Sequence, residues 1–165
     1  MTSRSYERLV CPIAQSLSVL GEQWPLLILR DVLFGYSRFE EFQSSLGISR
    51  NLLSRRLAEM VESGLLERRP LHEGAKRHEY VATDKARGLL PVLLALGQWT
   101  ERWDPSPDGP RVTPRDPESG EPVTVRLMPR GADRGVRPKD VLITPGPGAD
   151  AAFRDRLNRK RAAED

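Results

Sequence analysis

A single cysteine, Cys11, is present among the 165 residues of the sequence, together with only two histidines, His72 and His78. One thiol cannot form a disulfide within the chain or a cysteine-based zinc site, although it leaves a disulfide between two chains open. The histidines are more typical of surface residues than of metal ligands or pH switches. We therefore expect no metal, no other cofactor and a reducing, cytoplasmic location.

Long apolar runs and catalytic motifs are also missing. No stretch approaches the roughly 20 apolar residues of a membrane span, and residues 1–20 lack the apolar core and cleavage site of a secretory signal. The sequence has no phosphate-binding glycine loop, no paired metal ligands and no Ser, His and Asp set with a recognised spacing. We expect a protein that is not an enzyme and does not bind a membrane.

The prolines divide the chain into two parts. Ten of the fourteen lie after Trp103, and proline-rich sequence is typical of loops and linkers. We predict a folded domain over residues 6–103 and a C-terminal extension over residues 104–165. Within the extension, residues 122–128 and 140–144 have the pattern of short strands, and residues 149–164 that of a terminal helix. The extension could support a dimer, cover a ligand pocket or be partly disordered.

The folded domain begins with the pattern of two helices. Pro12 is suited to a first helical turn, and Gly21 ends that helix. Trp24 and Pro25 begin a second helix, which is apolar on nearly all sides and ends at Gly35. We expect this second helix to be the central buried element.

A third and a fourth helix follow, separated by a short turn. Ser37 is predicted to cap the third helix, with Glu40 completing a capping box. Gly47 lies in the turn, Ser49 is predicted to cap the fourth helix, and Gly64 ends it. Two helices joined by a short turn with glycine are the helix-turn-helix pattern.

The rest of the domain has the pattern of a hairpin and a long helix. Residues 65–71 and 77–82 are predicted strands around a polar tip at residues 72–76, which is the arrangement of a wing. A helix from Thr83 to Trp103 has so little polar face that we expect it to meet a partner surface. The predicted fold class is mainly α with a small β-wing (α+β), a winged helix-turn-helix DNA-binding domain.

The fourth helix carries the candidate DNA-binding face. At 100° per residue, Leu53 and Leu57 share an inward arc, while Asn51 and Arg55 centre the opposite one. The first two turns hold three arginines and no acid, and arginine and asparagine can bind guanine and adenine in the major groove. With the third helix and the wing tip included, the predicted DNA-binding residues are Arg38, Ser49, Arg50, Asn51, Ser54, Arg55, Arg56, Lys76 and Arg77.

These residues leave other interpretations open. The three arginines could form an ordinary solvated helix face, and the wing tip could be a solvated turn. Ser54 and Arg56 could bind phosphates and position the helix without reading a base. The alternative function is a winged-helix module that binds a protein partner and has no sequence-specific affinity for DNA.

Several short motifs follow one another along residues 11–103, and their combination is more specific than any one of them: Cys11-Pro12, Gly21 with Trp24, Arg38-Phe39, Leu53 to Leu57 with Arg56, Gly64-Leu65 and Glu79-Tyr80. The combination closely resembles the HxlR family of bacterial winged-helix regulators. His78 departs from the family pattern, in which an apolar residue is common at this position, so the contacts of the wing are less defined.

The resemblance implies a transcriptional repressor or activator, and we predict a repressor. It also implies a homodimer through the first and last helices. Such a dimer would place two recognition helices in successive major grooves of a near-palindromic operator in double-stranded DNA.

The signal that alters DNA binding has two candidates. Some members of the family sense quinones, aldehydes or oxidants through a cysteine near the position of Cys11, which precedes a helix N-terminus that favours a reactive thiolate. The other interpretation of Cys11 is a half-buried side chain near the dimer interface. A small hydrophobic effector is the alternative signal. Its pocket, or the dimer interface if these side chains only pack there, would be formed by Trp24, Leu27, Leu93, Leu96, Trp99 and Trp103.

Overall fold

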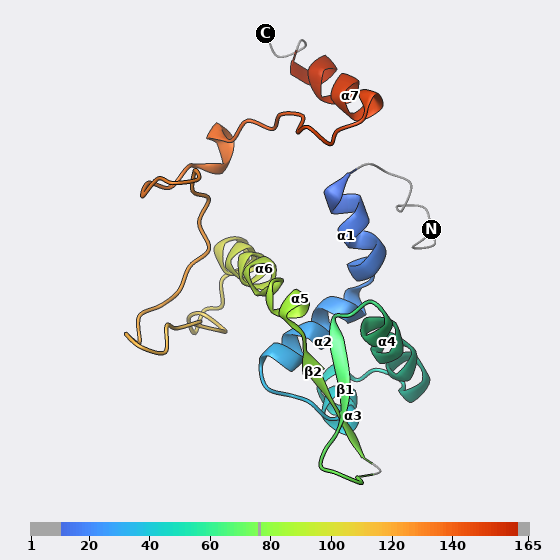
Figure 1. Ribbon diagram of the computed structural model, residues 1–165. Coiled ribbons are helices and arrows are strands. Elements are labelled where there is room, and N and C mark those ends of the chain that lie inside the picture. Colours follow the sequence, from blue (N-terminus) through green and yellow to red (C-terminus); the bar gives the residue numbers. More distant parts are fainter. Residues whose placement is uncertain (1–10, 76, 162–165) are drawn as a thin grey trace. The chain divides into compact units, whose positions relative to one another are not determined.

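The computed structural model describes residues 11–75 and 77–161 (Figure 1). The chain divides into two compact units. The larger unit runs from Glu22 to Val125. The smaller one contains helix α1 (Pro12–Leu20) and the chain from Arg126 onward. The predicted division at residues 103 and 104 therefore falls inside the larger unit, and that domain boundary stays a prediction.

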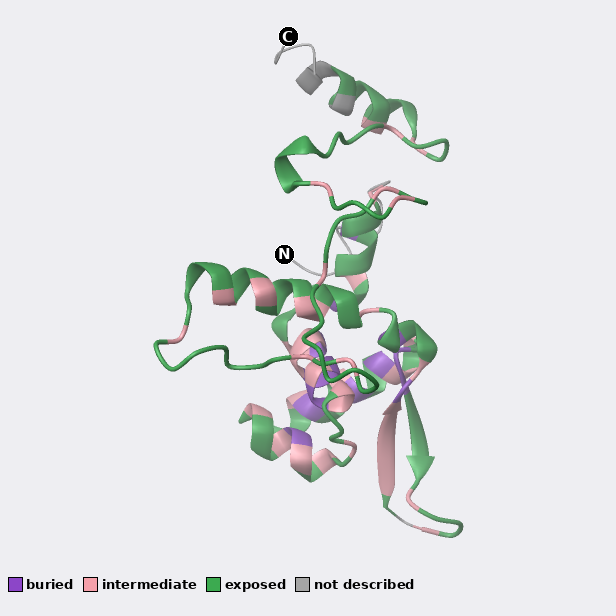
Figure 2. Ribbon diagram, turned by 90° about the vertical axis from the view of Figure 1, so that its left-hand side faces the viewer, coloured by how far each residue is buried: buried purple, intermediate pink, exposed green. Residues whose placement is uncertain are grey.

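Helix α2 (Gln23–Leu33) is the centre of the larger unit, as its apolar sequence predicted. It contacts helices α3 (Phe39–Leu46) and α4 (Arg50–Glu62), strand β2 (His78–Ala82) and helix α6 (Leu90–Trp103). Ile28 and Leu29 of α2 are completely buried, and so is Phe42 of α3. Figure 2 shows the buried residues gathered where these elements meet. Each fully buried apolar side chain of this size contributes roughly 1.5–3 kcal/mol.

The start of α3 differs from the prediction by one residue. Arg38, and not Ser37, precedes the helix, and the carboxylate that caps it belongs to Glu41 instead of Glu40. Glu41 accepts hydrogen bonds from the backbone N–H groups of Ser37 (2.9 Å) and Arg38 (2.8 Å). In the sequence, Ser37 with Glu40 and Arg38 with Glu41 both have the three-residue spacing of a capping box. In the structure, Glu41 is the glutamate that reaches both free amide groups.

The turn between α3 and α4 depends on Gly47. Its φ of 60° lies in the left-handed region, which glycine adopts without a steric penalty. The backbone N–H of Gly47 donates to the carbonyl oxygen of Gln43 and closes α3, so that the chain can enter α4 three residues later. The predicted short turn with glycine is confirmed.

The predicted hairpin is confirmed, with slightly shorter strands. β1 (Leu66–Pro70) and β2 (His78–Ala82) are antiparallel, and their register runs from Leu66 opposite Ala82 to Pro70 opposite His78. This two-stranded sheet follows α4 and contacts both α4 and α2. It therefore forms a wing beside the helix-turn-helix.

The predicted long helix from Thr83 to Trp103 is wrong in its continuity. The chain forms a short helix α5 (Asp84–Arg87) and a second helix α6 (Leu90–Trp103), with a break at residues 88–89. Pro91 explains the break, because proline lacks a backbone N–H and is accommodated in the first turn of a helix but not in its interior.

Helix α6 carries an exposed apolar stripe. Its half-buried side chains lie away from the stripe and include Leu93 and Leu94. The stripe residues are spaced by four, three and four positions, which places them within an arc of about 60°. Trp99 is 64% exposed and Trp103 68% exposed. The α6 stripe consists of Val92, Leu96, Trp99 and Trp103.

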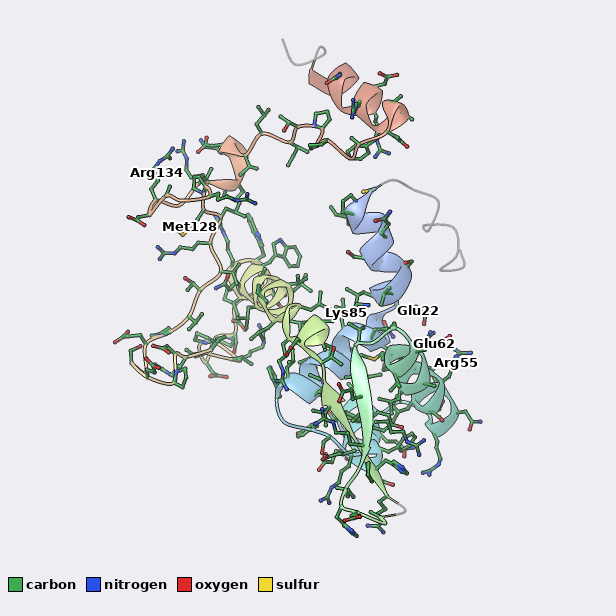
Figure 3. The ribbon with its side chains drawn as sticks, in the orientation of Figure 1. Glu22, Arg55, Glu62, Lys85, Met128 and Arg134 are labelled. Atoms are coloured by element: carbon green, nitrogen blue, oxygen red, sulfur yellow. The ribbon has the colours of Figure 1, made fainter. Side chains whose placement is uncertain are left out.

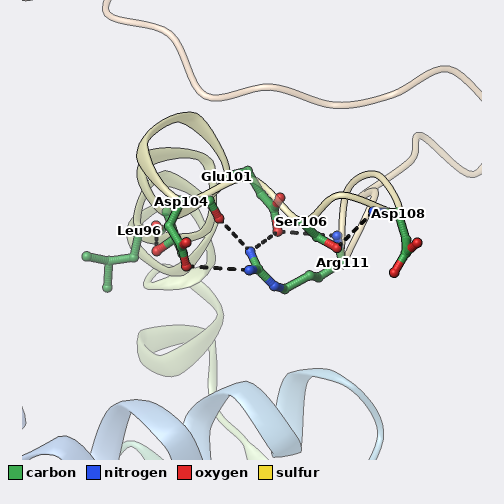
Figure 4. A network of polar contacts seen from close by, with 7 residues as sticks. Leu96, Glu101, Asp104, Ser106, Asp108 and Arg111 are labelled. Atoms are coloured by element: carbon green, nitrogen blue, oxygen red, sulfur yellow. Dashed lines mark hydrogen bonds and ion pairs between the residues drawn. The ribbon is translucent and has the colours of Figure 1, made fainter.

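Residues 104–125 return to α6 and belong to the larger unit. The Arg111 guanidinium pairs with Glu101 (3.2 Å) and Asp104 (3.5 Å), a network that Figure 4 shows from close by. The side-chain oxygen of Gln98 accepts a hydrogen bond from the backbone N–H of Val125. Exposed pairs of this kind contribute little stability each, but they explain why the compact unit extends beyond α6.

The predicted strands at residues 122–128 and 140–144 are wrong, because the structure has no strand in either segment. A strand is stable only against partner strands, and the described part of the extension offers one isolated bridge, between Arg115 and Pro122. The predicted terminal helix is confirmed as α7 (Ala151–Arg161), after a short 3-10 helix at Pro138–Asp140. No described side chain from Asp104 onward is buried.

Candidate nucleic-acid interface

The inner side of α4 determines which of its side chains face outward. Leu53, Leu57 and Met60 are buried in the core. The opposite side of the first two turns is exposed, and Figure 3 shows Arg55 on the side of α4 away from the sheet. The outward residues, which we call the α4 face, are Arg50, Asn51, Ser54 and Arg55. All four were predicted from the helical spacing.

The start of α4 combines an exposed backbone end with a cation. Ser49 is the residue before the helix, as predicted, but its side chain makes no capping hydrogen bond. The first turn contains no acidic residue. Arg50 lies over the ring of Phe39, with its guanidinium carbon 4.9 Å from the ring centre, which is a favourable cation–π distance. This end of the helix is suited to an anionic partner.

The remaining two arginines of α4 differ sharply from each other. The Arg55 side chain is 61% exposed and only loosely paired, with its Nε 3.9 Å from Glu59. The Arg56 side chain is 12% exposed and pairs with both Glu22 and Glu59. The sequence placed Arg56 on the flank of the DNA-binding face, whereas the structure directs it toward the residue that precedes α2. Sequence reasoning missed Glu22, because no local pattern relates two residues 34 positions apart.

The C-terminal end of α4 is bonded to the start of α5. The Thr83 hydroxyl donates to the carbonyl oxygen of Gly64 (2.8 Å), and the Lys85 ammonium donates to that of Ser63 (2.6 Å). Carbonyl groups at the end of a helix have no partner within the helix, and these two side chains supply one. The end of α4 is thereby fixed to the element that leads into α6.

Further exposed cations lie on the wing and at the start of α3. Arg77 is exposed beside the tip, and Arg38 is exposed at the start of α3. The predicted contact residue Lys76 lies outside the described residues. Sequence reasoning missed Arg68 on β1, whose guanidinium lies 3.2 Å from Nδ1 of His78. The sequence signal that could have drawn attention to Arg68 is the pair of adjacent arginines, Arg68 and Arg69, in a predicted strand of the wing.

The candidate effector or dimer-interface residues fall into two groups. Three are half-buried, namely Trp24 and Leu27 on α2 and Leu93 on α6. The other three are exposed members of the α6 stripe. Cys11 is half-buried directly before α1. The described residues contain no cluster of His, Cys, Asp or Glu arranged to hold a metal ion, and no described helix is long and apolar enough to cross a membrane.

Comparison with known proteins identifies the fold. The model of the HxlR-like helix-turn-helix family matches residues 19–108, which include α2 to α6. The chain belongs to this family. The uncharacterized HTH-type transcriptional regulator Rv3095 of Mycobacterium tuberculosis is 37% identical over 139 residues, covering 84% of this chain and 88% of the relative. YvaP, an uncharacterized HTH-type transcriptional regulator of Bacillus subtilis, is 35% identical over 100 residues, covering 59% of this chain and 93% of the relative.

Solved structures agree with this assignment. The HxlR-like chain matches the crystal structure of PA1607, a proposed transcription factor, with a TM-score of 0.75 and 37% identity, over 86% of this chain and 99% of that one. It also matches the redox regulator HypR in its reduced form, with a TM-score of 0.52 and 28% identity, over 56% of this chain and 92% of that one. The protein is a transcriptional regulator with a helix-turn-helix DNA-binding fold, in a family of regulators and not of enzymes.

The helix-turn-helix of this HxlR-like regulator begins with a charge-dependent cap. The backbone N–H groups of Ser37 and Arg38 hold the pKa of the Glu41 carboxyl below its usual range. Because the folded pKa is lowered, the stabilisation is present above the ordinary pKa of a glutamate, about 4.3, and is lost as the pH falls through the folded value.

We expect Glu41→Gln to cost about 0.3–1 kcal/mol at neutral pH and to weaken the acid dependence of stability. Urea unfolding at a series of pH values measures both effects. Glu40→Gln, which neutralises the adjacent exposed carboxylate, should keep the wild-type pH dependence. An acid dependence in Glu41→Gln as steep as that of the wild type would contradict the assignment of this cap.

Proposed function

We propose that this protein is a repressor that binds a near-palindromic operator in double-stranded DNA as a homodimer. The observation that carries the proposal is the α4 face, which combines Arg50, Asn51, Ser54 and Arg55 on the exposed side of the first two turns. Arginine can bind O6 and N7 of guanine, and asparagine can bind adenine, in the major groove. The N-terminal turns of a recognition helix are the part that contacts the bases.

The α6 stripe supports the homodimer. Its spacing of four, three and four residues is that of a helix that packs lengthwise against another helix. Tryptophan buries roughly 150–250 Å² when it is covered, so two exposed tryptophans per chain offer a large apolar area to a second copy. A two-fold dimer in which the two recognition helices are one turn of DNA apart requires half-sites about 10 base pairs between centres.

Two kinds of signal are proposed to release the protein from DNA. A thiol-reactive compound would act on Cys11, and the likeness to HypR, a redox regulator, supports this route. A small hydrophobic effector would act through the apolar side chains of α2 and α6, such as Trp24 and Leu93. The first route is tested directly, and the second is the alternative if the first fails.

Replacement of Arg55 tests the α4 face. Selection from a random duplex library with the wild-type protein should yield a two-fold repeat, and wild-type affinity for it should fall roughly a thousandfold between 50 and 200 mM salt for about six phosphate contacts. Arg55→Ala should weaken binding by about 1–3 kcal/mol and relax the preference at one base position of each half-site. Mobility shift with the selected duplex measures the affinity, and the same assay with duplexes substituted at single positions measures the base preference.

Arg87→Ala is the matched control, because it removes the same charge from an exposed position on α5. It should bind the selected duplex like the wild type. Wild-type affinity in Arg55→Ala would remove Arg55 from the interface. A flat salt response of the wild type, with no sequence selected, would favour a winged-helix module that binds a protein partner.

A charge in the α6 stripe tests the dimer. Trp99→Glu should raise the dissociation constant of the dimer by roughly thirtyfold or more, because large aromatic residues at the centre of an interface contribute about 2 kcal/mol or more. Sedimentation equilibrium measures the change. Thr100→Glu adds the same charge one position along, about 100° around the helix from Trp99 and outside the arc of the stripe, and should remain dimeric. A Trp99→Glu protein that is as dimeric as the wild type would place the interface elsewhere.

Replacement of Cys11 tests the thiol route. Diamide or a quinone should lower the affinity of the wild type for its selected duplex by about tenfold or more, and Cys11→Ser should lose this response. The untreated variant should bind like the wild type. If treated wild-type protein binds DNA unchanged, the thiol route is wrong and the hydrophobic effector becomes the proposed signal.

A further inference from the structure

Arg56 is distinguished from the other arginines of α4 by what its guanidinium contacts. One terminal nitrogen donates to Oε2 of Glu59 at 2.7 Å, and the other pairs with Glu22. Its Nε is buried and has no hydrogen-bond partner among the described residues. Both nitrogens that could grip a phosphate in the usual forked geometry are therefore occupied by carboxylates.

The two carboxylates come from different places in the fold. Glu59 lies on α4 itself, three positions after Arg56, whereas Glu22 is the residue immediately before α2. Helix α2 is the buried centre of the unit, and α4 packs against it. Arg56 thus connects the flank of α4 to the start of the central helix. Turning Arg56 toward DNA would break both pairs and leave two carboxylates beside the phosphate backbone.

We propose that Arg56 is a positioning residue, which together with Glu22 holds α4 at a fixed rotation relative to α2 and does not contact the operator. The inference rests on the proposed DNA-binding function and assigns different roles to residues that the sequence grouped together. Arg50 and Arg55 contact the nucleic acid, and Arg56 fixes the helix that carries them.

This role predicts the opposite change in DNA affinity from the one expected when an acidic residue near DNA is neutralised. A carboxylate beside a polyanion normally weakens binding, so its neutralisation should strengthen binding. If Glu22 holds α4 in place, its neutralisation should instead weaken binding to the specific sequence. Its neutralisation should not weaken binding to non-specific DNA, which depends mainly on charge and not on the rotation of α4.

The experiment compares Glu22→Gln with Glu62→Gln in the full-length protein. Glu62 is an exposed acid at the last position of α4, without a partner among the described residues, and is the matched control (Figure 3). The probes are the duplex selected by the wild type and a scrambled duplex of equal length and composition. Glu22→Gln should weaken binding to the selected duplex about tenfold and leave the scrambled duplex within about twofold of the wild type. Glu62→Gln should bind both probes at least as tightly as the wild type.

A second pair of measurements concerns Arg56 itself. Arg56→Gln should lower affinity for the selected duplex while the slope of log K against log salt stays that of the wild type. A lost phosphate contact would reduce the slope by about 0.9 per subunit. The double variant with Glu22→Gln and Arg56→Gln should bind no worse than Arg56→Gln alone, because the pair is already broken.

Three results would overturn the inference while leaving the proposed function intact. Tighter binding of both probes by Glu22→Gln would mean that Glu22 only masks a phosphate-binding Arg56. A reduced salt slope in Arg56→Gln would demonstrate a direct phosphate contact. A lower unfolding temperature of Glu22→Gln with unchanged DNA affinity would make the pair purely structural. A wild-type protein that selects no duplex would instead contradict the proposed function and this inference with it.

Discussion

The burial of one side of α4 is the constraint on which its DNA-binding face depends. Leu53, Leu57 and Met60 are buried together, and each such side chain contributes roughly 1.5–3 kcal/mol. A rotation of α4 by one residue position would expose part of this set and bury charged side chains without partners, which is costly. The direction of the four polar residues of the α4 face is therefore a consequence of where three apolar residues go.

Apolar burial sets this rotation only coarsely, and polar contacts refine it. Two carboxylates, Glu22 and Glu59, lie close to a surface proposed to meet phosphates, where an uncompensated negative charge would oppose binding. Arg56 pairs with both and offsets part of their charge, which leaves Arg50 and Arg55 as the exposed arginines of the helix. A simple count of arginines on α4 therefore overstates the charge that the helix offers to DNA.

Most of the fold could be predicted because its signals are local. The ends of α1, α2 and α4 follow from proline, glycine and apolar spacing, and the hairpin from two short strands around a polar tip. The errors have nonlocal or degenerate causes. Residues 122–128 alternate like a strand but have no partner strand, Pro91 fits the first turn of a new helix as well as a kink, and the partner of Arg56 lies 34 positions away.

The break between α5 and α6, which the apolar pattern concealed, lies between the two proposed interfaces. Thr83 and Lys85 bond the end of α4 to α5, and only two residues separate α5 from α6. In a dimer formed through α6, this short path would set the distance between the two recognition helices. Half-sites one turn of DNA apart, about 34 Å, demand a well-defined distance, since a loose joint would lower the chance that the second helix meets its half-site once the first is bound. The hydrogen bonds of Thr83 and Lys85 thus restrain the junction between α4 and α5. Flexibility at this junction would reduce the simultaneous binding of both half-sites.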